Sequence, residues 1–115
     1  MSDQATVRIR ELNDQFRQSI GTASPLGKIY MTAGVVALGE PFGLRTIAAI
    51  KAFDAFTSDI DPHNEHDMVR VTVDAVIVWG KIDYFSSDDP DLGSEDPADP
   101  AKTERVMTIM LPEEY

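Results

Sequence analysis

The amino-acid sequence predicts an α+β domain, with two helices packed on one face of a mostly antiparallel four-stranded sheet. Two segments repeat apolar residues at three- and four-residue steps, which is typical of amphipathic helices. Other segments alternate apolar with polar residues, which is typical of half-buried strands. These elements follow in the order α-β-α-β-β-β, and a length of 115 residues suits a single domain.

The first helix is predicted near the start of the chain, where Ser2 or Asp3 can cap it and Gly21 can end it. Its apolar face is expected to consist of Ala5, Ile9, Leu12, Phe16 and Ile20. Its solvent-facing side is expected to carry Arg8, Arg10, Glu11, Asp14 and Arg17. A short strand from Lys28 to Thr32 follows, because its residue types suit a pleated surface.

A second helix is predicted from about Pro41 to Phe56. Proline suits the first turn of a helix, where its missing N–H would have no partner in any case. The apolar stripe is expected to contain Leu44, Ile47, Ile50, Phe53 and Phe56. Alanines beside this stripe allow close approach to a sheet, so we expect the helix to be well buried.

Three strands are predicted in the second half. Valines alternate with polar residues from Val69 to Val73, and Asp74 with Ala75 offers a tight connection to the next strand. That strand, Val76 to Tyr84, contains Gly80, which predicts a bulge or a close backbone contact. The last strand is predicted from Arg105 to Leu111.

Trp79 lies on the strand from Val76 to Tyr84, and alternation places it on one face with Lys81 and Asp83. We expect Trp79 to pack beneath a helix. A recognition patch formed by these three side chains is the alternative.

The charge is distributed unevenly along the chain. Residues 1–55 carry six Lys and Arg against five Asp and Glu, whereas residues 56–115 carry four against fifteen. The formal net charge of −10 therefore comes from the second half, at −11 against +1. Such a negative field disfavours direct binding to nucleic acid or membranes and favours cations or a basic protein surface. The chain has no cysteine and no apolar run long enough to span a membrane, so we expect a cytoplasmic protein.

One loop, Thr57 to Asp67, is rich in residues that can bind metal. Five potential ligands occupy alternate positions and a sixth adjoins them: Asp59, Asp61, His63, Glu65 and Asp67, with His66. Alternate oxygen ligands with a turn residue near the sixth place, here Asn64, are typical of calcium loops. The twelfth place is Arg70 rather than glutamate, so a true EF-hand is excluded and only a looser calcium site is predicted.

Three other interpretations of this loop stay open. His63 and His66 lie three residues apart and could bind zinc together with a carboxylate. His66 could act as a base with Glu65 or Asp67 as its orienting acid. The structural alternative is that these side chains cap the second helix and hold the loop by hydrogen bonds to backbone.

The segment from Ser86 to Ala101 is predicted to be a long acidic surface loop, kept extended by three prolines. Its carboxylates are Asp88, Asp89, Asp91, Glu95, Asp96 and Asp99. An extended line of carboxylates can imitate nucleic-acid phosphates and so occupy a basic groove on another protein. The alternative is a solvated loop whose charge serves only solubility.

Several motifs resemble one group of small bacterial proteins, catalogued as a domain of unknown function and common in proteobacteria. The matching segments are Ile9 to Arg17, Phe53 to Thr57, Asp59 to Asp67, Lys81 to Tyr84, Ser94 to Pro100, Arg105 to Leu111 and Glu114-Tyr115. The pattern of that group has glycine at Asn64, and it lacks the Gly80 that here separates Trp79 from Lys81. The resemblance implies an association with mobile elements and assigns no catalytic residues.

The leading hypothesis is a non-enzymatic acidic protein that binds a basic protein surface, such as a restriction or CRISPR-type complex, by mimicking nucleic acid. It needs no cofactor. The alternative is a metal-binding module or metal-dependent hydrolase centred on Asp59 to Asp67, with calcium or zinc. A third hypothesis is a structural subunit that docks through its first helix. The sequence leaves the oligomeric state open.

Overall fold

The structure, a computed structural model, describes residues 3–22 and 26–115. Its elements are α1 (Gln4–Gln18), β1 (Gly27–Met31), α2 (Ala33–Val36), α3 (Glu40–Ala52), β2 (Met68–Val73), β3 (Val76–Ser86), β4 (Thr103–Met110) and the 3₁₀ turn η1 (Pro112–Glu114). The predicted α+β class is confirmed. The single-turn helices α2 and η1 were not predicted, because such short elements show no periodic pattern.

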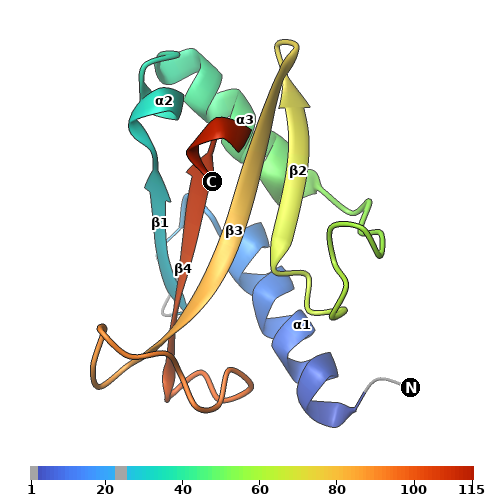
Figure 1. Cartoon of the computed structure of the whole chain (residues 1–115), viewed down its shortest axis with the longest axis vertical. Helices are drawn as coiled ribbons and strands as arrows, with labels where there is room; N and C mark the ends of the chain where they lie inside the picture. The colour runs from blue at the N-terminus through green and yellow to red at the C-terminus, as the bar shows by residue number, and fades with distance from the viewer. Residues whose placement is uncertain (1–2, 23–25) are drawn as a thin grey trace.

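The four strands form one mixed sheet in the order β1-β4-β3-β2. The β2–β3 and β3–β4 pairs are antiparallel, while β1 runs parallel to β4, so the sheet is mostly antiparallel as predicted. The two long helices lie on one face of this sheet, which is the far face in Figure 1. The C-terminal turn η1 lies on the near face.

Helix α1 begins where the sequence places a cap. The carboxylate of Asp3 accepts a hydrogen bond from Thr6 N at 2.7 Å, and Gly21 has a φ of +94° just beyond the helix. The alternative cap, Ser2, lies outside the described residues. Arg17 was expected on the solvent-facing side, and this expectation is wrong: its side chain is buried at 3% exposure, against Asp14 and Phe56.

Helix α3 is shorter than predicted, since it ends at Ala52. Phe53 already has an extended backbone, and Phe56 lies on the loop that follows the helix. Leu44 was assigned to the buried stripe, but it is 61% exposed. The buried face instead contains Phe42, Gly43, Thr46 and Ile50.

The β2–β3 hairpin forms as the alternation predicts, with Asp74 and Ala75 both at positive φ in its tight turn. The β3 register runs past Gly80 without interruption, so the predicted bulge is wrong. The close approach at Gly80 is made by a side chain and not by another backbone, since a Cβ there would lie 2.8 Å from Val69 Cγ2. Trp79 does not pack beneath α1 or α3; it faces away from them and contacts Tyr115, with ring centroids 5.4 Å apart.

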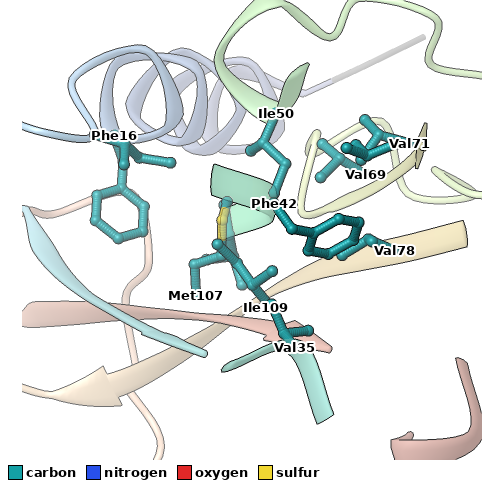
Figure 2. Packing of buried hydrophobic residues seen from close by; sticks show 12 residues of the cluster. Phe16, Val35, Phe42, Ile50, Val69, Val71, Val78, Met107 and Ile109 are labelled. Carbon is teal, nitrogen blue, oxygen red and sulfur yellow. The ribbon is translucent and has the colours of Figure 1, made fainter. Parts of the chain in front are cut away.

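The hydrophobic core lies between the helices and the sheet (Figure 2). Phe16 of α1, Val35 of α2, and Phe42 and Ile50 of α3 face side chains from the three strands β2, β3 and β4. These strand residues are Val69, Val71, Val73, Val78, Ile82, Met107 and Ile109. The core thus excludes the two polar loops, which project from its margins (Figure 1).

Within residues 3–22 and 26–115, none of the helices combines the length and apolar character that crossing a bilayer requires.

Candidate functional site

Two polar segments contain the residues that the sequence analysis selected. The histidine loop (residues 57–67) connects α3 to β2, and the acidic loop (residues 87–102) connects β3 to β4. The histidine loop contacts α1 directly, and the fold uses the side chains of the two segments differently.

In the histidine loop, His66 binds an aspartate of α1. Its Nδ1 lies 2.8 Å from Asp14 Oδ1, and its Nε2 lies 3.7 Å from Asp61 Oδ2. Because His66 has a φ of +56°, its ring can turn back toward the helix. Each ring nitrogen therefore faces a carboxylate.

The side chain of Asp61 stabilises the conformation of the histidine loop by hydrogen bonds to its backbone. Its side chain is buried at 4% exposure, and its Oδ1 accepts hydrogen bonds from the backbone N–H groups of Glu65 and His66, both at 3.0 Å. Asn64, the turn residue of the sequence analysis, has a φ of +59°, the left-handed conformation that asparagine tolerates. The expectation of side-chain bonds to the loop backbone is confirmed for Asp61, and in the described residues its bonds hold the loop and not the end of α3.

Phe56 joins the loop to α1. Its ring stacks on His66, with centroids 3.7 Å apart and planes 4° from parallel, and the Arg17 guanidinium lies 5.1 Å from the Phe56 centroid. Arg17 Nη1 also donates to Asp14 Oδ1 at 2.9 Å. Asp14 is thus shared by a histidine and a buried arginine, which fixes the position of the histidine loop against the helix.

The predicted metal ligands do not converge. Asp59 and His63 are exposed, Asp61 is buried, and Glu65, His66 and Asp67 are half-buried. Within the described part of the chain, which includes this whole loop, no three His, Asp or Glu side chains gather as a metal site would require. Geometry therefore gives the calcium and zinc hypotheses no support.

The acid–base interpretation of His66 also needs correction. The carboxylate that binds its Nδ1 belongs to Asp14, not to Glu65 or Asp67 as the sequence suggested. Sequence reasoning missed Asp14 because the two residues are 52 positions apart. Since both ring nitrogens face carboxylates that belong to the fold, the arrangement suits a structural contact better than proton transfer to a substrate.

Glu65 and Asp67 belong to a second part of this network. The Tyr84 hydroxyl donates to Glu65 Oε1 at 2.8 Å, and burial raises the pKa of Tyr84, so the hydroxyl stays protonated. Burial also raises the pKa of Asp67, and the nearby carboxylates of Glu65 and Asp61 raise it further. The loop therefore concentrates negative charge in a partly desolvated place.

The acidic loop is fastened to the end of the sheet by its backbone and hydroxyl groups. Ser86 N donates to Leu92 O at 2.8 Å, and Ser94 N donates to Tyr84 O at 3.0 Å. The buried hydroxyl of Thr103 donates to Asp96 O at 2.8 Å and lies 2.7 Å from Ser94 Oγ. These bonds set the course of the loop without using its carboxylates.

The carboxylates themselves face outward. Five are exposed and Asp99 is half-buried, and within the described residues none of the six forms an ion pair: Asp88, Asp89, Asp91, Glu95, Asp96 and Asp99. Two of them also stabilise local turns, since Asp89 accepts from Asp91 N and Asp99 accepts from Ala101 N. The loop therefore presents negative charge that is not neutralised within the described chain.

A hollow of about 320 Å³ opens on this loop. Its lining combines the acidic residues Asp88 and Glu95 with Leu92, which is 59% exposed, and with Lys102. An apolar wall beside carboxylates can accommodate the aliphatic stem and charged head of a lysine or arginine.

Three buried polar residues of this region were missed by sequence reasoning. They are Asn13, Arg17 and Arg105, all at most 3% exposed. Each has a recognisable signal, because Asn13 and Arg17 follow Ile9 at four-residue steps and Arg105 alternates in phase with Met107 and Ile109. A polar residue at an apolar position of a periodic pattern indicates a buried network.

Comparison with known families gives one match. Residues 31–114 match the model of the family described as "Protein of unknown function (DUF3768)". The match covers both polar loops and β2, β3 and β4, and it leaves out α1. No curated protein and no solved structure matches the chain. Because the match spans well over half of its length, the chain belongs to this family.

Proposed function

We propose that this member of the family is a non-enzymatic binding protein whose acidic loop docks on a basic surface of a partner protein. The observation that carries the proposal is the contrast within the loop. Its backbone is held by hydrogen bonds to β3 and β4, while its carboxylates have no counter-charge among the described residues. A charged surface that is already positioned loses less conformational entropy on binding.

The partner class follows from the charge. Unneutralised carboxylates on one loop attract lysine and arginine side chains, and basic grooves of this kind are built to bind phosphates. We propose a partner that binds nucleic acid, such as a restriction or CRISPR-type complex, which this protein would block by occupying its groove. The hollow between Asp88 and Glu95 would receive one basic side chain of that partner.

The cytoplasm is the proposed location. The chain contains no cysteine, which is compatible with a reducing compartment. Nucleic-acid-handling complexes of the proposed kind work there.

The test compares two variants with the same net charge. One reverses Asp88, Asp89, Asp91 and Glu95 to lysine, and the control reverses four exposed acids elsewhere: Glu40, Asp54, Asp59 and Glu113. The wild-type protein and both variants serve as bait in native-host lysate at low and high salt, and mass spectrometry identifies bound proteins. We expect the loop variant to lose salt-sensitive basic partners and the control to lose fewer.

Circular dichroism and thermal melts establish that both variants are folded. Equal capture by a folded loop variant and by the wild-type protein would rule out the acidic loop as the binding surface. Equal loss in both variants would assign the attraction to net charge and not to the loop.

A further inference from the structure

A single buried cation joins the acidic loop to the interior. Arg105 extends from the inward side of β4 and is completely buried. Its Nη2 donates to the backbone oxygen of Pro97 in the acidic loop at 2.6 Å, and its Nε donates to Asn13 Oδ1 at 2.7 Å. One side chain therefore contacts both the acidic loop and α1.

The position of this arginine is costly for stability. In the described chain no carboxylate lies within ion-pair distance of Arg105, and its Nη1 has no hydrogen-bond partner. Burial lowers the pKa of its guanidinium, which means that the surroundings disfavour its charge. The Tyr84 ring, 5.3 Å from the guanidinium carbon, compensates only in part. Stability alone does not explain a cation here.

Asn13 continues the connection to the histidine loop. Its Nδ2 donates to Glu65 O at 2.9 Å and lies 2.8 Å from the Tyr84 hydroxyl oxygen. Asn13 is itself completely buried, so its amide has a fixed orientation. The hydrogen-bonded pair of Arg105 and Asn13 therefore connects the two polar loops: Arg105 contacts the acidic loop, and Asn13 contacts the histidine loop.

We propose that Arg105 is a positioning residue of the acidic surface. By holding the carbonyl of Pro97, it sets the turn between Asp96 and Asp99 and hence the direction of their carboxylates. Asn13, anchored to the histidine loop, keeps the guanidinium at the angle that this bond requires. The inference rests on the proposed function for its consequence in binding, but the hold on the loop can be measured without a partner.

Hydrogen exchange of the free protein tests the hold on the loop. In Arg105→Met, amides of the turn beyond Pro97, namely Asp99 and Lys102, should exchange at least about tenfold faster. The amide of Ser86, bonded to Leu92 O on the other side of the loop, is the internal reference and should not change. The melting temperature should change little, because methionine removes the buried charge but leaves Asn13 Oδ1 and the Pro97 carbonyl without their donor.

A matched control distinguishes the effect of losing Arg105 at its buried position from the effect of losing one positive charge. Arg70→Met also removes one positive charge, but from the exposed face of β2, where Arg70 lies near Trp79. It should leave exchange at Asp99 and Lys102 unchanged. Arg105→Lys keeps the charge, but one ammonium group cannot easily contact both Asn13 and the Pro97 carbonyl. We therefore expect exchange rates at Asp99 and Lys102 between those of the wild-type protein and Arg105→Met.

Binding of a nona-arginine peptide, measured by calorimetry at low salt, tests the consequence. Arg105→Met makes the protein more negative, so charge alone would strengthen binding. Disordering of the surface should instead weaken it, by about fivefold. Arg70→Met, with the same net charge, should bind as tightly as the wild-type protein or more tightly.

The outcomes separate the two proposals. Unchanged exchange at Asp99 and Lys102 in Arg105→Met overturns the positioning role, whatever the peptide does. Equal peptide binding by the wild-type protein and the acidic-loop reversal variant overturns the proposed function, and the exchange result still decides the role of Arg105. If the methionine variant does not fold, Arg105→Lys is the deciding variant: exchange at the wild-type rate in it refutes the two-sided guanidinium contact on which the positioning role rests.

Discussion

The histidine loop and the acidic loop contain the same kinds of side chain, yet the fold uses them in opposite ways. In the histidine loop, Asp61 is buried and accepts two backbone hydrogen bonds, and Glu65 accepts one from Tyr84. In the acidic loop, serine and threonine hydroxyls, backbone groups and Arg105 make most of the attachments. A carboxylate that accepts hydrogen bonds within the protein stabilises the fold, whereas an exposed carboxylate without an ion pair can interact with a partner. Acid content alone therefore does not identify a binding surface.

The largest expected effect is the loss of Asp61. Asp61→Ala should lower the free energy of unfolding by roughly 2–4 kcal/mol, because two backbone N–H groups lose their partner in a partly buried loop. Urea unfolding measures the change, with Asp59→Ala at an exposed position as the control. A similar small change in both variants would mean that the histidine loop is no more dependent on its carboxylates than the acidic loop is.

A smaller effect concerns Asp67 and pH. Burial raises the pKa of this carboxyl above its ordinary value of 3.8, so the folded state holds the proton more firmly than the unfolded chain does. Its contribution to stability is then fully present below pH 3.8 and is lost as the pH rises through the folded pKa. At neutral pH the ionised group opposes folding.

Asp67→Asn should therefore raise the melting temperature at pH 7 by about 1–3 °C, a modest gain because solvent reaches this half-buried side chain. The gain should shrink as the pH falls toward 4. Thermal melts of the wild-type protein and the variant across this range measure the gain. A gain that grows toward low pH would contradict the sign of the shift.

Neutralising the acidic loop should have almost no effect on stability. Replacing Asp88, Asp89, Asp91 and Glu95 by their amides should change the free energy of unfolding by less than about 0.5 kcal/mol, since these side chains are exposed and the amide oxygens can still accept turn hydrogen bonds. Urea unfolding at low and high salt checks this. A large loss would show that the carboxylates support the loop and would weaken the contrast between the two regions.

The smallest effect is expected from metal ions. Calcium or zinc at millimolar concentration, or a chelator, should move the melting temperature by less than about 1 °C, since the described residues do not gather a metal site. Differential scanning fluorimetry measures the shift. A rise of several degrees that Asp61→Ala or His66→Ala abolishes would restore the metal hypothesis for the histidine loop.

Much of the fold could be predicted because its signals are local. Alternation in β2 and helical spacing in α1 reflect burial of one face, and both elements form where these patterns lie. The boundary of α3 and the exposure of Leu44 were not predictable in this way. Both depend on tertiary packing beyond the helix. Phe56, which was assigned to the apolar stripe of the helix, lies on the following loop and stacks on His66, ten positions later.

The candidate sites were predictable as segments but not as contacts. The sequence identified both polar loops, and it identified Asn64 as a turn residue, where the structure has a φ of +59°. It did not pair His66 with Asp14 or Arg17 with Phe56, because those contacts join residues of different elements. Such pairings depend on how α1 crosses the sheet, which no local pattern specifies.

By itself, the sequence determined the fold class, the main elements and a strongly acidic second half, since periodicity and composition are properties of neighbouring residues. Only the tertiary structure decided which carboxylates are occupied and which are free. Two contacts that occupy carboxylates, Asp14 with His66 and Glu65 with Tyr84, span 52 and 19 positions along the chain. Hydrogen bonds of that span form only when packing of the apolar core has brought the helix and the strands together.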